Sequence, residues 1–287
     1  MRLMMSSFVL AGVLITGGCQ QAPVVQQSAK PINLLGDLQM RSAQSTFTSS
    51  TTTETGGILV NTLGMRMVPV EATTFTMGSP MSESGRLEDE HQHPVRISKR
   101  FYMATTEVTQ AQWMKVMRSE PWKGMKYVAI GRDQPATHIT YDDAVQFCWA
   151  LSRLENATYR LPTESEWELA ARTGGEGAYG ISGSLDEYAW TDINVLKSYP
   201  AVVATRKVSG AGLFDMHGNV AEWCSDWYGP YPRSLVTDPT GPSTGEYRIV
   251  RGGAWDSGAR FCRSAYRNGT DGQSRSGSVG LRVVLVK

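Results

Sequence analysis

Apolar residues recur at helical spacing in three segments of the chain, and each segment begins with a capping signal. After Thr140, for example, Ala144, Phe147 and Leu151 fall on one face of a helix. In each segment a threonine is followed three residues later by an acidic or amide side chain, as in a capping box. The three pairs are Thr109 with Gln112, Thr140 with Asp143, and Thr163 with Glu166. These signals predict three helices.

Short runs of β-branched and aromatic residues predict strands elsewhere in the chain. The expected strands cover residues 67–70, 75–77, 95–97, 247–250 and 281–286. After residue 174 the chain consists mostly of short turns, in which Gly and Pro separate aromatic residues. So few regular elements in so long a chain predict a fold that accepts long irregular loops.

The N-terminal pattern predicts an export signal. Arg2 supplies a positive charge, and residues 8–15 form an apolar run too short for a permanent membrane span. Small residues lead into Cys19 and resemble a lipobox, in which the cysteine is acylated after residues 1–18 are removed. An ordinary secreted protein that is cleaved nearby is the alternative.

Residues 19–55 are expected to form a lipidated N-terminus and a flexible tether. Gln20 follows the cysteine, where an Asp would favour the inner membrane, so we expect a lipid anchor in the outer membrane of a Gram-negative cell envelope. The Ser/Thr-rich run 45–53 has little to bury and cannot offset the entropy of ordering. The folded domain is expected to cover residues 56–287.

Charge and composition exclude some classes of partner. The 28 Lys and Arg residues nearly balance 27 Asp and Glu residues, which leaves a formal net charge of +1. Because proteins that bind nucleic acid usually carry a strong basic excess, no nucleic-acid partner is expected. The hydrophobic content of 41% is typical of a globular protein with a packed core.

A series of short motifs follows the chain from residue 65 to residue 286. They read Phe-Thr-Met-Gly-Ser at 75–79, Thr-Glu-Val-Thr at 106–109, Arg-Leu-Pro-Thr-Glu-Ser-Glu-Trp-Glu at 160–168, His-Gly-Asn-Val-Ala-Glu-Trp at 217–223, Arg-Gly-Gly-Ala-Trp at 251–255 and Gly-Leu-Arg-Val at 280–283. In this order they resemble the formylglycine-generating enzyme, or sulfatase-modifying-factor, family. The resemblance implies a single mixed α+β domain that is related to the C-type-lectin fold and has little regular structure for its size.

The resemblance also locates where the chemistry of the family takes place. Its enzymes oxidise a sulfatase cysteine to formylglycine, using molecular oxygen and copper held by two cysteines. Matched to this sequence, Ser257 stands at the first cysteine position and Cys262 at the second. Because Cu(I) prefers soft thiolate ligands, a serine hydroxyl cannot replace the missing thiolate, and no copper is expected. A copper- and oxygen-dependent oxidoreductase that acts through Cys262 is the alternative.

The resemblance suggests roles for other residues too. After Cys19, an odd number of cysteines remains, and the family brings the segments of Cys224 and Cys262 close enough for a disulfide; three reduced, buried thiols including Cys148 are the alternative. A structural Ca²⁺ is implied at Asn219, the Val220 carbonyl and Glu222. The alternative is that Asn219 and Glu222 only form hydrogen bonds with the surrounding loops.

The expected function is that of a binding or scaffold module, because the fold can display variable side chains on a rigid support. Aromatic and Arg residues are common anchors in recognition. The residues expected on the surface where the enzymes accept their peptide are Trp255, Asp256, Arg260, Tyr266, Arg267 and Asn268. A cell-envelope protein, a peptide or a glycan is the expected partner. Some lectin-like relatives are diversified targets of retroelements.

Overall fold

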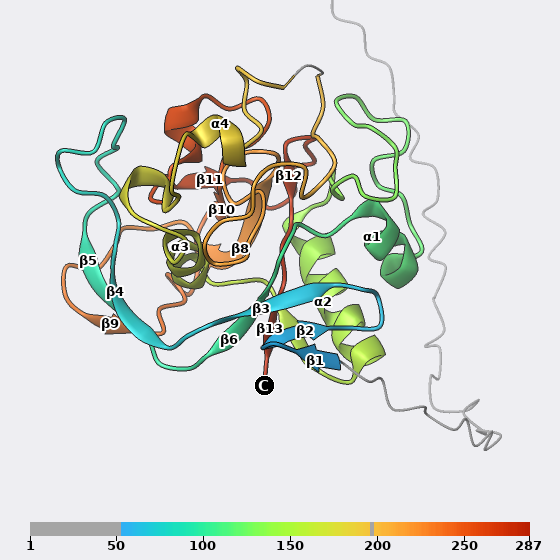
Figure 1. The fold of residues 1–287 in the computed structure, drawn as a ribbon, viewed down its shortest axis with the longest axis horizontal. Helices are drawn as coiled ribbons and strands as arrows, with labels where there is room; N and C mark the ends of the chain where they lie inside the picture. The colour runs from blue at the N-terminus through green and yellow to red at the C-terminus, as the bar shows by residue number, and fades with distance from the viewer. Residues whose placement is uncertain (1–52, 196–197) are drawn as a thin grey trace, which may run out of the picture. The chain divides into compact units, whose positions relative to one another are not determined.

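A computed structural model of the chain describes residues 53–195 and 198–287 (Figure 1). The predicted signal peptide, Cys19 as the predicted lipidation site and the predicted tether as far as residue 52 lie outside the described residues. The first described strand, β1 (Thr53–Thr55), pairs with β2 (Ile58–Val60), so regular structure begins inside the stretch assigned to the tether. Among the described residues, no helix has both the length and the apolar character needed to cross a bilayer.

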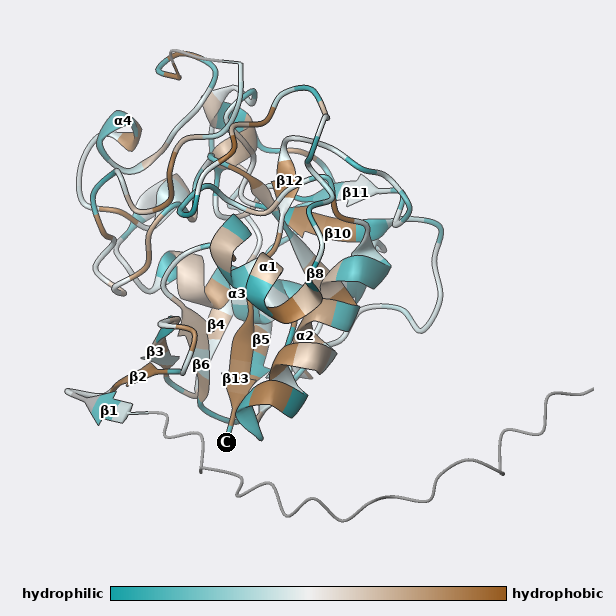
Figure 2. Ribbon diagram, turned by 90° about the vertical axis from the view of Figure 1, so that its right-hand side faces the viewer, coloured by the Kyte–Doolittle hydropathy of each residue, from teal (hydrophilic) through white to brown (hydrophobic). Residues whose placement is uncertain are grey.

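The largest sheet has six strands in the order β1-β2-β3-β6-β13-β7, and all neighbouring strands are antiparallel. The further strands are β3 (Arg66–Val70), β6 (Phe101–Ala104), β13 (Val284–Val286) and β7 (Thr158–Arg160). Strand β13, from the end of the sequence, therefore lies in the interior of the sheet between β6 and β7. Figure 2 shows β6 and β13 as largely hydrophobic strands.

Two smaller sheets complete the β structure. A four-stranded sheet has the order β11-β10-β8-β12, with β12 parallel to β8, and a three-stranded sheet has the order β4-β5-β9, with β9 parallel to β5. Their strands are β8 (Ala221–Trp227), β10 (Arg248–Arg251), β11 (Asn268–Thr270), β12 (Val279–Gly280), β4 (Thr73–Met77), β5 (His93–Ile97) and β9 (Val236–Thr237).

All three predicted helices are present, and each begins with the predicted capping box. They are α1 (Gln110–Met117), α2 (Tyr141–Glu155) and α3 (Glu164–Arg172), followed by the short α4 (Leu185–Tyr188) and by 3₁₀ turns at 177–179 and 259–262. Helix α1 packs on α2, and α2 packs on β7. Helix α3 packs against both smaller sheets, and Figure 2 shows α2 with alternating apolar and polar bands.

The core has two parts that meet at the six-stranded sheet. One part lies under α1 and α2, where the rings of Trp113 and Phe147 stack with 5.3 Å between their centroids. The other part surrounds Trp167 of α3, which is fully buried. The mixture of helices, mainly antiparallel sheets and long loops confirms the predicted α+β class.

The strand predictions were less complete than the helix predictions. The strands expected near residues 67–70, 75–77, 95–97 and 247–250 are present as β3, β4, β5 and β10. Of the run 281–286, only residues 284–286 form a strand. Strand β8 was not predicted, although it forms the centre of the four-stranded sheet.

Candidate functional site

A surface hollow of about 790 Å³ lies against the four-stranded sheet, and each strand of that sheet contributes a lining residue. Most of the remaining lining comes from the chain between residues 253 and 278. The carboxylate of Asp192 comes from the irregular segment after α4. The hollow is therefore built almost entirely from one stretch of the sequence.

Four of the residues predicted at the site do line this hollow: Asp256, Ser257, Tyr266 and Asn268. They are exposed or half-buried. The Ser257 hydroxyl accepts a hydrogen bond from the Ala254 N–H at 3.1 Å and so closes the turn at the edge of the hollow. The Ser278 hydroxyl donates to the Asp256 carboxylate at 2.6 Å, which joins the two ends of the lining segment.

The turn beneath the hollow requires glycine. Gly253 has φ +69°, and a Cβ placed there would lie 2.6 Å from the Cys262 Sγ and 2.7 Å from the Phe261 carbonyl oxygen. Both the left-handed backbone and the lack of space exclude a side chain at this position. The Arg-Gly-Gly motif therefore brings residues 253–257 close to the 3₁₀ turn at 259–262.

Two predicted residues lie beside the hollow rather than in its lining. The Trp255 ring is buried, and its Nε1 donates to the Gly277 carbonyl at 3.2 Å. Arg260 is exposed, and its guanidinium lies 4.3 Å from the ring centroid of Phe261, which does line the hollow.

The prediction that Arg267 lies on the binding surface was wrong. Its side chain is buried and donates to both Glu164 carboxylate oxygens at 2.6 and 2.8 Å, and its guanidinium lies 3.7 Å from the Tyr231 ring centroid. The reason is the alternation of an extended chain: Tyr266 and Asn268 face outward, so the residue between them faces the interior.

Buried arginines hold the framework under the hollow. Arg251 pairs with Glu164 and Glu168 of α3, and Arg263 pairs with Glu90 of the loop between β4 and β5. These arginines are at most 1% exposed. They were not predicted as framework residues, because a charged residue in a single sequence looks like a surface residue unless its partner is known.

The sequence reasoning also missed several lining residues. They are Asp192, Phe261, Thr270, Ser274, Arg275 and Ser276. Most belong to a run of small polar residues that reads as an ordinary loop. No motif of the sequence covers this run, so it offered no signal for the site.

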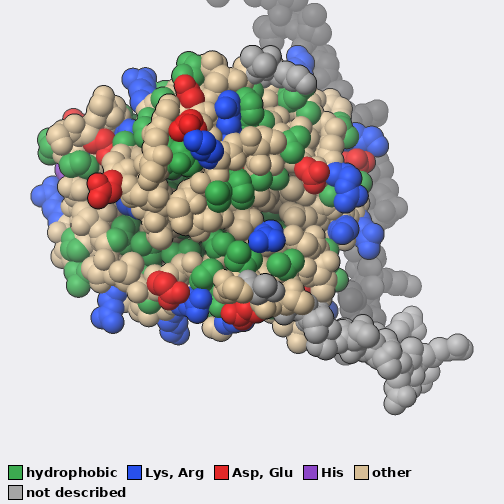
Figure 3. Space-filling view, viewed as in Figure 1, with side chains coloured by type: hydrophobic (Ala, Val, Ile, Leu, Met, Phe, Trp, Pro, Cys, Tyr) green, Lys and Arg blue, Asp and Glu red, His purple; other side chains and the backbone are tan. Residues whose placement is uncertain are grey.

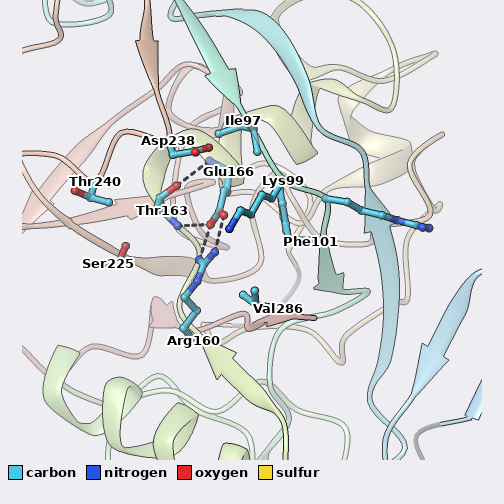
Figure 4. Close-up of a pocket in the computed structure, with 11 residues that line it drawn as sticks. Ile97, Lys99, Phe101, Arg160, Thr163, Glu166, Ser225, Asp238, Thr240 and Val286 are labelled. Atoms are coloured by element: carbon cyan, nitrogen blue, oxygen red, sulfur yellow. Dashed lines mark hydrogen bonds and ion pairs between the residues drawn. The ribbon is translucent and has the colours of Figure 1, made fainter.

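A second hollow, of about 290 Å³, contains none of the predicted site residues (Figure 4). Its most conspicuous charges are already paired, because the Arg160 guanidinium donates to both Glu166 oxygens at 2.6 and 2.7 Å. On the face seen in Figure 3, charged side chains of both signs are interspersed. Neither observation points to a second site.

Residues 60–287 match the family described as the Sulfatase-modifying factor enzyme 1-like domain. The chain belongs to this family. Among its relatives, "Chaperone protein LppX" from Paenibacillus barcinonensis is 30% identical over 239 residues, covering 65% of this chain and 80% of the relative. The formylglycine-generating enzyme of Streptomyces coelicolor is 33% identical over 204 residues, covering 60% of each chain.

Solved structures show the same fold. "Treponema denticola variable protein 1" aligns with a TM-score of 0.71 at 25% identity, covering 82% of this chain and 98% of the other. PvdO from Pseudomonas aeruginosa aligns with a TM-score of 0.72 at 26% identity, covering 82% of this chain and 100% of the PvdO chain. The fold is therefore the C-type-lectin-related fold of the sulfatase-modifying-factor family that the motifs predicted.

The residues at the two cysteine positions of the family do not fit a copper centre. Ser257 lines the hollow, whereas Cys262 is fully buried, and its Sγ lies 3.8 Å from the Gly258 carbonyl oxygen. Burial, with smaller contributions from the nearby Asp192 and Asp256, raises the pKa of the Cys262 thiol to about 12. A buried, protonated thiol and a serine hydroxyl do not supply the pair of thiolates that Cu(I) favours.

The predicted disulfide is also absent. Within residues 53–195 and 198–287, Cys148, Cys224 and Cys262 are all free and buried. The structure therefore corresponds to the alternative of three reduced thiols.

Nor do the residues predicted to bind calcium fit that ion. The Glu222 carboxylate accepts hydrogen bonds from the Arg282 guanidinium and from Trp167 Nε1, so a cationic side chain already compensates its charge. The Asn219 amide donates to Glu107 at 3.0 Å and accepts from the Ala201 N–H at 2.9 Å. In the described part of the chain, no three His, Cys, Asp or Glu side chains are grouped to hold a metal ion. The set Asn219, Val220 and Glu222 thus corresponds to the hydrogen-bonded alternative.

Proposed function

We propose that this chain is a non-catalytic binding module of the sulfatase-modifying-factor family, and that its ligand binds in the hollow formed by residues 253–278. The observation that carries the proposal is that this segment contains both side chains that face the hollow and side chains that are buried in the framework. The residues that face the hollow, such as Asp256, Ser257 and Asn268, are exposed or half-buried, whereas Arg263 and Arg267 between them are buried and paired.

Because of this arrangement, substitutions at the exposed positions can change which ligand is recognised without changing the fold. Exposed side chains that take no part in packing can be replaced at a cost within about 0.5 kcal/mol. The buried residues of the same segment cannot, because each fills space or neutralises a buried charge. The likeness to Treponema denticola variable protein 1, whose name describes a variable protein, supports the proposal.

The proposed setting is the cell envelope, with a lipid on Cys19 as the anchor. The pattern before Cys19 supports this setting. A peptide or a cell-envelope protein is the proposed class of partner, and the likeness to a relative named as a chaperone supports it. The oxidoreductase alternative is disfavoured because Ser257 replaces one cysteine and Cys262 is buried.

The test is a triple variant of the full chain, with Asp256, Ser257 and Asn268 each changed to Ala, screened on peptide and glycan arrays. We expect the ligands of the unmodified protein to be lost while the free energy of unfolding changes by no more than about 1.5 kcal/mol. The matched control changes Thr74 of β4, Arg96 of β5 and Gln92, which immediately precedes β5, to Ala; all three are exposed. Equal loss of binding in the control would contradict the proposal.

The catalytic alternative is tested with the same protein. Copper, oxygen, a reductant and a Cys-x-Pro-x-Arg peptide are added, and aldehyde is sought by mass spectrometry. We expect none from the unmodified chain. Aldehyde formation would refute a purely binding role, and a Ser257→Cys variant run in parallel would show whether only the missing thiol prevents the reaction.

A further inference from the structure

The charged residues that line the hollow include more acidic than basic side chains. They are Asp192, Asp256 and Arg275. The Arg275 guanidinium pairs with Asp143 at 2.8 Å and donates to the His138 carbonyl at 2.7 Å. Because Asp143 already compensates Arg275, the two lining carboxylates leave the hollow with a negative charge.

Both carboxylates lie at the same turn. The Asp192 Oδ2 is 3.7 Å from the position that a Cβ on Gly258 would take, and the Asp192 N–H donates to the Ser257 carbonyl at 3.3 Å. Asp256 stands two residues before Gly258 and accepts a hydrogen bond from the Ser278 hydroxyl. Within the described residues, neither carboxylate forms an ion pair with a Lys or Arg side chain.

An aromatic pair completes this side of the hollow. The rings of Phe261 and Tyr266 lie 5.1 Å apart at an angle of 60°, and both line the hollow. The Arg260 guanidinium already lies over the Phe261 ring. Carboxylates beside aromatic rings attract an ammonium or guanidinium group and provide apolar surface for its aliphatic stem.

We propose that the hollow binds a basic side chain, the ammonium or guanidinium of a Lys- or Arg-containing peptide, beside Asp192 and Asp256 with its stem against Phe261 and Tyr266. This inference rests on the proposed binding function and specifies its ligand class. The volume of about 790 Å³ lies within the range of pockets that enclose small ligands.

A basic peptide fits this lining better than a sugar does. The serine hydroxyls of the hollow can form hydrogen bonds with either ligand. A neutral sugar, however, would cover two carboxylates without neutralising them, and burying uncompensated charge is unfavourable. A cationic side chain supplies the missing charge.

The test measures the binding of fluorescein-labelled tetralysine and tetra-arginine to the full chain by fluorescence anisotropy, with labelled tetraglutamine and tetraglutamate as comparison probes. We expect the two basic probes to bind and the other two not to bind. The Asp192→Asn and Asp256→Asn variants are each expected to weaken binding about fivefold, as loss of a partly exposed ion pair does. The double variant should weaken it about 25-fold if the two effects add.

Asp271→Asn is the matched control, because Asp271 lies exposed on the same segment but does not line the hollow. It removes the same charge and should leave affinity within about twofold. Thermal unfolding of each variant checks that the fold is intact.

Failure to bind either basic probe, or equal weakening by Asp271→Asn, would overturn the proposed ligand class. If tetraglutamine or an array glycan bound instead, and the Ala substitutions at Ser257 and Asn268 abolished that binding, the binding function would stand without its basic ligand. If no probe depended on any lining residue, both proposals would fail together.

Discussion

Arg260 and Arg263 lie three residues apart on the same segment but in opposite surroundings. Arg260 is exposed, whereas Arg263 is 1% exposed and donates to Glu83 and to both carboxylate oxygens of Glu90, which is itself fully buried. Their contributions to stability should therefore differ even though the residue type is the same.

Replacing Arg263 with Ala should destabilise the protein by about 3 kcal/mol, because the Glu90 charge would remain buried without a cationic partner. Replacing Arg260 with Ala should change the free energy of unfolding by no more than about 0.5 kcal/mol. Urea denaturation of the two variants measures both values. Similar losses would show that the Arg263 ion pair is not the source of its effect.

Asp226 predicts a pH dependence of stability. Burial, with a contribution from the nearby Glu164, raises the pKa of Asp226 from 3.8 to about 7 in the folded protein. Between pH 4 and 7, Asp226 therefore holds its proton more tightly in the folded than in the unfolded state. Its contribution to the free energy of unfolding falls as the pH rises through this range. Above pH 7 its contribution should no longer change.

The variant Asp226→Asn isolates this effect. An amide keeps an oxygen that can accept the Glu164 N–H, which the carboxylate accepts at 3.0 Å. We expect the unmodified protein to lose on the order of 4 kcal/mol relative to the variant between pH 4 and pH 8. Urea denaturation across this range gives the difference directly, and parallel curves would contradict it.

At the residue scale, the sequence selected residues that line the hollow, such as Ser257, but it did not give the orientation of every side chain. Arg267 was misplaced because its partner Glu164 lies 103 residues away in the sequence. The alternation with Tyr266 and Asn268 spans too few residues to show by itself which side faces the interior.

Helices were predictable because their start signals are local. Thr163 accepts the Glu166 N–H, while Glu166 accepts the Thr163 N–H, so four consecutive residues fix where α3 begins. Helix α3 also supplies Glu164 and Glu168 to the buried arginines, which makes its starting point important for the framework.

Thr163→Ala should lower the free energy of unfolding by about 1 kcal/mol, the usual cost of losing an N-cap. Ser184→Ala is the control, because Ser184 precedes α4 without forming a side-chain capping hydrogen bond. That change should be nearly neutral. Thermal unfolding followed by circular dichroism compares the two, and an equal effect would exclude capping as the cause.

Strands were harder to predict because several are buried on both faces. Most residues of β8 are buried, so the strand lacks the alternation of apolar and polar side chains that marks a half-exposed strand. In β6 all four residues are buried. The burial of both strands depends on packing against α3 or on neighbouring strands that come from elsewhere in the sequence.

The whole fold depends on contacts between remote segments. Strand β13 joins β6 to β7, and Val284 and Leu285 are at most 2% exposed. A chain that ends before Val284 would leave β7 without a strand partner and β6 paired on one side only, with β3, and would open the core.

Deleting residues 284–287 should therefore abolish cooperative unfolding, with loss of the near-ultraviolet circular dichroism signal. Deleting only Lys287 should have little effect, because it is exposed and its ion pair with Glu54 is also exposed. A cooperative transition in the longer deletion would show that β13 is dispensable.

The hollow is formed mainly by one uninterrupted stretch of the chain, and this has a consequence for inheritance. One short piece of coding DNA, for residues 253–278, specifies most of the lining, although the codon for Asp192 lies outside it. Under the proposed binding function, rewriting that piece alone would change the ligand in a single event, provided that the codons for the buried arginines are kept. Lineages that share this framework would then diverge in what they bind while remaining able to fold.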